Sequence, residues 1–141
     1  MSYLIDTNVL SEAMAARPSP EVQAWVAGQA PTSLHFSVGT ISEIDFGIAR
    51  LDAGQRRERL LEWRDRLVLA AGRRIHLVDL PIARAWGEIR ARAAAAKRTM
   101  PLMDALLAAT AEVHGLTLVT RNIRDFEAWG GPVLNPWPSA P

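Results

Sequence analysis

Short apolar runs alternate along the chain with longer segments whose apolar residues recur at helical spacing. The runs at residues 2–5, 34–37 and 116–120 have the length of buried strands, and the last of them is the clearest. Residues 74–78 and 133–134 are weaker strand candidates. Strands that alternate with helices favour a largely parallel sheet of about four to five strands, flanked by helices on both faces. We therefore expect an α/β fold.

The segments between these strands carry helix signals. Ser19 precedes Pro20, the order expected for an N-cap followed by the first helical residue, and Gly115 is a typical helix stop. The expected helices span residues 7–15, 20–28, 38–51, 54–71, 81–97 and 102–114, and residues 123–129 form a short helix or a turn.

Length and composition indicate one ordinary globular domain covering residues 1–141, with 49% hydrophobic and 22% charged residues. The chain contains no cysteine, which excludes disulfides, thiolate metal sites and a cysteine nucleophile. The N-terminal region has no basic leader, and no apolar stretch approaches the roughly 18 residues of a membrane span. We therefore expect a cytoplasmic protein without a membrane segment.

The net charge of +1 is uninformative, but the basic residues are clustered. One reading is a surface that binds a polyanionic substrate. The other, and the more frequent for such clusters, is a set of solvated helix faces with ion pairs along each helix. The clusters comprise Arg56, Arg57, Arg59, Arg64 and Arg66 in one segment, and Arg90, Arg92, Lys97 and Arg98 in another.

Three acidic residues occupy apolar surroundings: Asp6 ends the first strand, Glu43 lies inside residues 38–51, and Asp104 interrupts an apolar helix. A carboxylate in such surroundings is costly unless a cation or hydrogen-bond donors compensate its charge. Asp6 and Asn122 both follow strands, and the carboxyl ends of parallel strands form the ligand-binding edge of an open α/β sheet. Convergence at that edge would create a site for a divalent metal.

Each polar residue also has a structural explanation. Asp6 could cap the following helix, Asp104 could interact with a helix dipole, and Asn122 could be a turn residue. Glu43 is harder to explain in this way, because it lies at the margin of the apolar stripe of its helix. Together these explanations require several coincidences.

Other sites receive less support. His35, His76 and His114 lie on separate predicted elements without the spacing of metal ligands. The chain has no serine in a nucleophile elbow and no glycine-rich phosphate loop. The five tryptophans are mostly inside predicted helices, so we expect them in the core or at an interface rather than stacked on bases.

Four ordered motifs resemble those of PIN-domain ribonucleases, and more narrowly those of the VapC/FitB class of toxins from type II toxin–antitoxin pairs. The motifs are LIDTNVL at residues 4–10, SEI followed by Gly47 at residues 42–47, MDALLAATA at residues 103–111 and LVTRNIRDF at residues 118–126. The resemblance covers essentially the whole chain. It implies a PIN fold, Mg²⁺- or Mn²⁺-dependent endoribonuclease activity and a cognate antitoxin that blocks the site.

The resemblance also assigns roles by position. Asp6 and Asp104 correspond to direct metal ligands, and Glu43 corresponds to the acid that holds the metal or its bound water. The fourth position is Asn122 where many PIN domains have aspartate, and Asp125 could supply part of that function. Residues expected to orient the carboxylates are Thr7, Asn8 and Thr120.

The resemblance further implies an RNA substrate, a homodimer and a larger complex with the antitoxin, and Arg90, Arg92, Lys97 and Arg98 could guide RNA to the metal. Two alternatives stay open. One is a phosphatase that uses Asp6 as a covalent nucleophile, although Asn8 stands where that class usually has a second aspartate. The other is a PIN-like domain that binds a partner without cleaving RNA. The sequence does not specify the RNA target or whether one or two ions bind.

Overall fold

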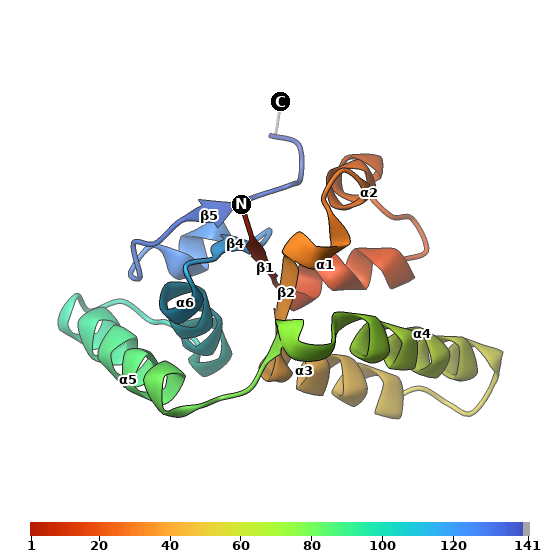
Figure 1. Cartoon of the computed structure of the whole chain (residues 1–141), viewed down its shortest axis with the longest axis horizontal. Coiled ribbons are helices and arrows are strands. Elements are labelled where there is room, and N and C mark those ends of the chain that lie inside the picture. Colours follow the sequence, from red (N-terminus) through yellow and green to blue (C-terminus); the bar gives the residue numbers. More distant parts are fainter. Residues whose placement is uncertain (140–141) are drawn as a thin grey trace.

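A five-stranded parallel sheet with the strand order β3-β2-β1-β4-β5 lies at the centre of the molecule (Figure 1). The structure is a computed structural model that describes residues 1–139. The strands are β1 Tyr3–Ile5, β2 Leu34–Ser37, β3 Ile75–His76, β4 Thr117–Val119 and β5 Val133–Leu134. All five predicted strands are confirmed, with each observed strand lying within the predicted range.

Six α-helices surround the sheet. They are α1 Thr7–Ser11, α2 Pro20–Ala27, α3 Val38–Ala49, α4 Gln55–Ala71, α5 Leu80–Ala95 and α6 Leu102–His114. The first predicted helix is shorter than expected, because it continues as a 3₁₀ turn, Glu12–Met14. The segment predicted as a short helix or turn forms the 3₁₀ turn Ile123–Phe126. No helix of residues 1–139 is both long and apolar enough to cross a bilayer.

The helix ends follow the local signals in the sequence. The Ser19 hydroxyl accepts a hydrogen bond from the Val22 amide at 3.4 Å, as expected of an N-cap. Gly115 ends α6 with φ of 64°, a left-handed conformation that is cheap only for glycine. Both signals are local, which is why these boundaries were predictable.

Two apolar cores lie on opposite faces of the sheet, because successive side chains of a strand point in opposite directions. Leu4 of β1 packs with the core that includes residues of α5 and α6. Ile5, its neighbour, packs with Phe36 of β2 and Val22 of α2. Figure 1 shows α5 and α6 on one side of the sheet and α1, α2 and α4 on the other.

The central position of β1 determines where the polar residues meet. Tyr3 pairs with Leu34 of β2 on one side and with Thr117 of β4 on the other. Beyond β1, the Asp6 amide donates to the Val119 carbonyl at 3.0 Å. The residues that follow β1 and β4 therefore leave the sheet side by side at its carboxyl edge, as predicted.

Candidate functional site

Asp6 occupies this edge and is held by three hydrogen-bond donors. Its side chain is buried, with 8% exposure. Oδ1 accepts from the Thr7 amide at 2.6 Å, and Oδ2 accepts from the Thr120 hydroxyl at 2.7 Å and from Asn8 Nδ2 at 3.4 Å. Asp6 thus caps α1, as its structural explanation required, and the three residues expected to orient it all contact it.

The same contacts join the turn after β4 to the start of α1. The Thr120 hydroxyl accepts from the Asn122 amide at 3.1 Å and from Asn8 Nδ2 at 3.3 Å. Asn8 Oδ1 accepts from the Arg121 amide at 3.3 Å. The Thr120 hydroxyl is fully buried and receives two donors, so its own proton is directed at Asp6.

Asp104 is the third residue of α6 and is half-buried. Burial raises its pKa to about 6, and the negative charges of Asp6, Asp125 and Glu43 contribute to this increase. Burial also raises the pKa of Asp6, while hydrogen bonds from Thr120 and Thr7 act in the opposite direction. Burial therefore disfavours the ionised form of both acids, and only Asp6 has hydrogen-bond donors that oppose this effect.

The remaining predicted residues lie at the exposed rim. Glu43 is exposed, and it lines a pocket of about 180 Å³ together with Thr7 and Arg56. Asn122 and Asp125 are also exposed, and Asp125 raises the pKa of both Asp6 and Asp104. The structure thus places four carboxylates from four elements within electrostatic range of one another, with one of them buried, one half-buried and two exposed.

None of these four carboxylates takes part in an ion pair among residues 1–139. The ion pairs among residues 1–139 are Arg64–Asp45, Arg64–Asp65, Arg92–Glu112 and Arg98–Glu127. Within the same residues, no three acidic or histidine side chains converge closely enough to form a complete metal-ligand set by themselves. The site therefore has a surplus of negative charge.

The first turn of α3 contributes two residues that the sequence did not identify. A Cβ added at Gly39 would lie 2.5 Å from Met103 Sδ and 3.1 Å from Leu106 Cδ2, so Gly39 permits α3 to approach α6 closely. Thr40, one turn before Glu43, is 1% exposed, and its Oγ1 has no hydrogen-bond partner. The sequence signal available for these two residues was a glycine followed by a threonine, Gly39 and Thr40, at the start of a predicted helix.

The basic residues predicted to guide RNA are partly engaged elsewhere. Arg98 Nη1 binds Glu127 Oε2 at 2.9 Å. Arg92 Nη2 lies 3.4 Å from Glu112 Oε1, and Glu112 is eight residues after Asp104 on α6, roughly 12 Å along the helix axis. Arg90 and Lys97 are exposed. In the other cluster, Arg64 is part-buried and forms ion pairs with Asp65 on its own helix and with Asp45 on α3.

The three histidines converge, although the sequence gave no indication of it. His35 Nδ1 lies 2.9 Å from His76 Nε2, and the His76 and His114 rings stack with centroids 4.0 Å apart. Burial lowers the pKa of His76 to about 4, with His114 and His35 contributing, and burial also lowers the pKa of His35. His114 follows Asp104 by ten residues, roughly 15 Å along α6, so this cluster is separate from the acids.

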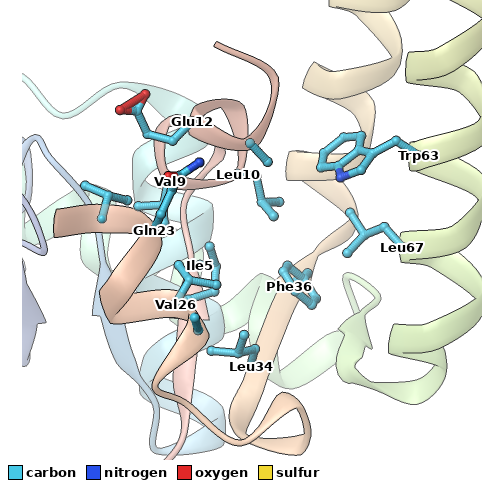
Figure 2. Close-up of a pocket in the computed structure, with 13 residues that line it drawn as sticks. Ile5, Val9, Leu10, Glu12, Gln23, Val26, Leu34, Phe36, Trp63 and Leu67 are labelled. Atoms are coloured by element: carbon cyan, nitrogen blue, oxygen red, sulfur yellow. The ribbon is translucent and has the colours of Figure 1, made fainter. Parts of the chain in front are cut away.

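An apolar groove of about 390 Å³ opens between α2 and α4 (Figure 2). Figure 2 shows Trp63 and Leu67 of α4 facing Phe36 across the groove, and Val26 of α2 and Leu34 of β2 also line it. Glu12 and Gln23 are its polar members. The residues that line the groove come from segments far apart in the sequence, so no local sequence pattern predicted the groove.

The comparison with known proteins identifies the family. The PIN domain family model matches residues 3–130. The VapC ribonuclease Y4jK of Sinorhizobium fredii is 36% identical over 97% of this chain and 99% of its own length. The chain therefore belongs to the PIN domain family, and the predicted resemblance and fold class are confirmed.

Solved structures agree with this assignment. The crystal structure of FitAcB from Neisseria gonorrhoeae superposes with a TM-score of 0.91 at 32% identity, covering 96% of this chain and 98% of that one. A toxin–antitoxin complex from Klebsiella pneumoniae gives a TM-score of 0.71 at 26% identity, covering 96% and 98% of the two chains. The chain thus has the fold of these proteins over nearly its whole length.

Proposed function

Because this chain is a PIN-domain protein, we propose that it is a divalent-metal-dependent endoribonuclease and the toxin of a type II toxin–antitoxin pair. The observation that carries the proposal is the group of four carboxylates at the carboxyl edge of the sheet, two of which have raised pKa values because of burial and mutual repulsion. The protein relatives support the rest, since one is a VapC ribonuclease and another forms a toxin–antitoxin complex.

The donor set fits a hard divalent cation. Mg²⁺ and Mn²⁺ prefer oxygen ligands, and Mg²⁺ usually keeps several waters and takes only one or two carboxylates from the protein. Asp6 and Asp104 would hold the ion directly, and Glu43 would hold it through water. Asn122 and Asp125 would complete the polar rim.

The bound ion would make a coordinated water more acidic and would stabilise negative charge on the phosphoryl oxygens. The residues of the chain prepare the site for it. Hydrogen bonds from Thr7 and Thr120 oppose the effect of burial on the Asp6 pKa, and together with Asn8 they fix the direction of its lone pairs. Asp104 is destabilised in its ionised form by burial and repulsion, so a cation relieves a cost that is already present.

The proposed protein partner is a small antitoxin. Its apolar segment would occupy the groove between α2 and α4, which Trp63, Leu67 and Phe36 line without a cover in the single chain (Figure 2). A partner helix with apolar residues on one face suits such a groove. We also propose a homodimer, to which exposed Leu69 on α4 could contribute, and a cytoplasmic location, where RNA is available.

The direct test is RNA cleavage by the purified chain, freed from antitoxin, with Mg²⁺, with Mn²⁺ and with EDTA. We expect cleavage with either metal and none with chelator. Asp6→Asn and Asp104→Asn should reduce cleavage at least about 100-fold and retain the wild-type circular dichroism spectrum. Full activity in either variant, or cleavage that persists in EDTA, would contradict the proposal.

A further inference from the structure

A basic and aromatic surface lies next to the four acids, where β4 and β5 end. The two strands are neighbours, and the Thr120 amide donates to the Leu134 carbonyl at 3.0 Å. The segments that begin at Arg121 and Asn135 therefore leave the sheet side by side. The guanidinium of Arg121 lies over the indole of Trp137, 5.2 Å from the ring centroid.

An open hollow of about 390 Å³ adjoins this pair and is lined by residues 121–125. It includes the exposed side chains of Arg121 and Arg124 together with Asp125, which acts electrostatically on Asp6 and Asp104. Neither arginine takes part in an ion pair among residues 1–139. Two available positive charges thus stand at the rim of a strongly negative site.

The backbone of this surface is already ordered. The Arg121 amide donates to Asn8 Oδ1, and the Asp125 amide donates to the Asn122 carbonyl at 3.1 Å. On the other segment, the Trp137 amide donates to Asn135 Oδ1 at 2.9 Å, and its ring packs against the core that contains Val119. Such an arrangement loses little conformational entropy when a ligand binds.

We propose that Arg121, Arg124 and Trp137 form a subsite for single-stranded RNA beside the acids, an inference that rests on the proposed ribonuclease function. Arg124 binds a backbone phosphate near the cleaved bond. The guanidinium plane of Arg121, supported by Trp137, stacks on an unpaired base. Unpaired RNA bases commonly stack on aromatic rings or on arginine planes, whereas bases in a duplex do not expose their faces.

The charge balance favours this assignment. A phosphate that approaches four carboxylates is repelled, and a bound divalent ion offsets only part of that repulsion. Arginines in the same hollow provide the missing attraction, with planar geometry suited to phosphate and to stacking. Arg92 and Arg98, which were predicted for this role, are paired with Glu112 and Glu127. Arg90 and Lys97 are exposed and take part in no ion pair among residues 1–139, so for these two residues the role in guiding RNA stays a prediction.

The test measures binding of a short fluorescent single-stranded RNA in EDTA, at several salt concentrations, with every variant carrying Asp104→Asn to prevent cleavage. Arg124→Gln should reduce the slope of log affinity against log salt by about 0.7, the change expected for one lost phosphate contact. Arg121→Lys keeps the positive charge but removes the planar guanidinium group, so it should weaken RNA binding about tenfold with an unchanged salt slope. Trp137→Ala should also weaken RNA binding about tenfold with an unchanged salt slope, and its melting temperature should be recorded as a check on folding.

Arg66→Gln on α4 is the matched control, because it removes one exposed positive charge from another surface. Equal effects of Arg66→Gln and Arg124→Gln on RNA binding, or unchanged binding in Arg121→Lys, would overturn the proposed subsite. The proposed function would still hold in that case if the wild-type chain cleaves RNA. Loss of antitoxin binding without loss of RNA binding would assign the surface to the protein partner and would also overturn it. A wild-type chain that cleaves no RNA would instead contradict the proposed function.

Discussion

Two clusters of ionisable side chains lie near different ends of α6, and burial shifts pKa values within them in opposite directions. Burial disfavours the charged form of each group, so the pKa values of Asp6 and Asp104 are raised and those of His35 and His76 are lowered. Because its pKa is lowered to about 4, His76 is neutral near pH 7, and the histidines contact one another through a 2.9 Å nitrogen–nitrogen contact and a stacked ring pair.

The acids are not neutralised by contacts of this kind. With a pKa of about 6, Asp104 is still mostly ionised at pH 7, and the donors around Asp6 favour its charge. The acidic cluster therefore keeps an electrostatic cost that a bound cation would relieve, whereas the histidines contact one another directly. This difference is why we propose the metal site at the acids and not at the histidines, although both groups consist of residue types that bind metals.

Substitutions in the two clusters should differ most in RNA cleavage. Asp6→Asn should reduce kcat/KM at least about 100-fold, because it removes a charged ligand. His76→Phe keeps an aromatic ring in the stack and should leave kcat/KM within about twofold, since it lies outside the site. A large loss in His76→Phe, with its fold intact, would mean that the histidines belong to the active site.

The hydrogen-bonding partners of Asp6 should have an intermediate effect. Thr120→Val preserves the shape of a fully buried side chain and removes the hydroxyl that donates to Asp6 at 2.7 Å. We expect roughly a 10-fold loss of activity and weaker activation by Mg²⁺, as for residues that orient metal ligands. Thr110→Val is the matched control, because its buried hydroxyl donates within α6 to the Leu106 carbonyl. Equal losses of activity would contradict the orienting role.

The clusters should also differ in their effect on thermal stability without metal. In EDTA at pH 7.5, Asp104→Asn should raise the melting temperature by roughly 2–4 °C, which corresponds to about 1 kcal/mol after allowance for solvent screening. The cause is the removal of carboxylate repulsion. Added Mg²⁺ should stabilise the wild-type chain but not this variant. A lower melting temperature for Asp104→Asn in EDTA would contradict the account of an uncompensated charge.

The smallest expected effect is in the pH dependence of stability. His35 and His76 have lower pKa values folded than unfolded, so the unfolded chain takes up their protons first as the pH falls. The histidine contribution should be complete above about pH 6.5 and should decrease as the pH falls toward 4. Asp104, whose pKa is raised, acts in the opposite sense below pH 6.

Thermal melts between pH 4.5 and 7.5 should therefore be compared in the Asp104→Asn background. His76→Phe in that background should show a shallower loss of stability on acidification. Nearby charges that act on the cluster, Arg74 and Asp79, remain in place in both proteins. An identical pH dependence would show that the histidine contact does not require a neutral ring.

The predictable features were those carried by local sequence. Asp6 and Thr120 follow apolar strand signals directly, so a parallel sheet brings them together. The histidine cluster, the apolar groove and the contact of Arg121 with Trp137 depend on strand order and on how distant segments pack. Glu43 was expected at the margin of an apolar stripe and is exposed, because that side of α3 faces the open rim rather than the core.

The proposed metal site at Asp6 and Asp104 is tested most directly by locating Mn²⁺ from its anomalous scattering in crystals of the antitoxin-free chain. We expect a peak between the carboxylates of Asp6 and Asp104 that disappears in Asp104→Asn. A peak at His35 and His76 instead, or no peak beside Asp6 at Mn²⁺ concentrations that support cleavage, would contradict it.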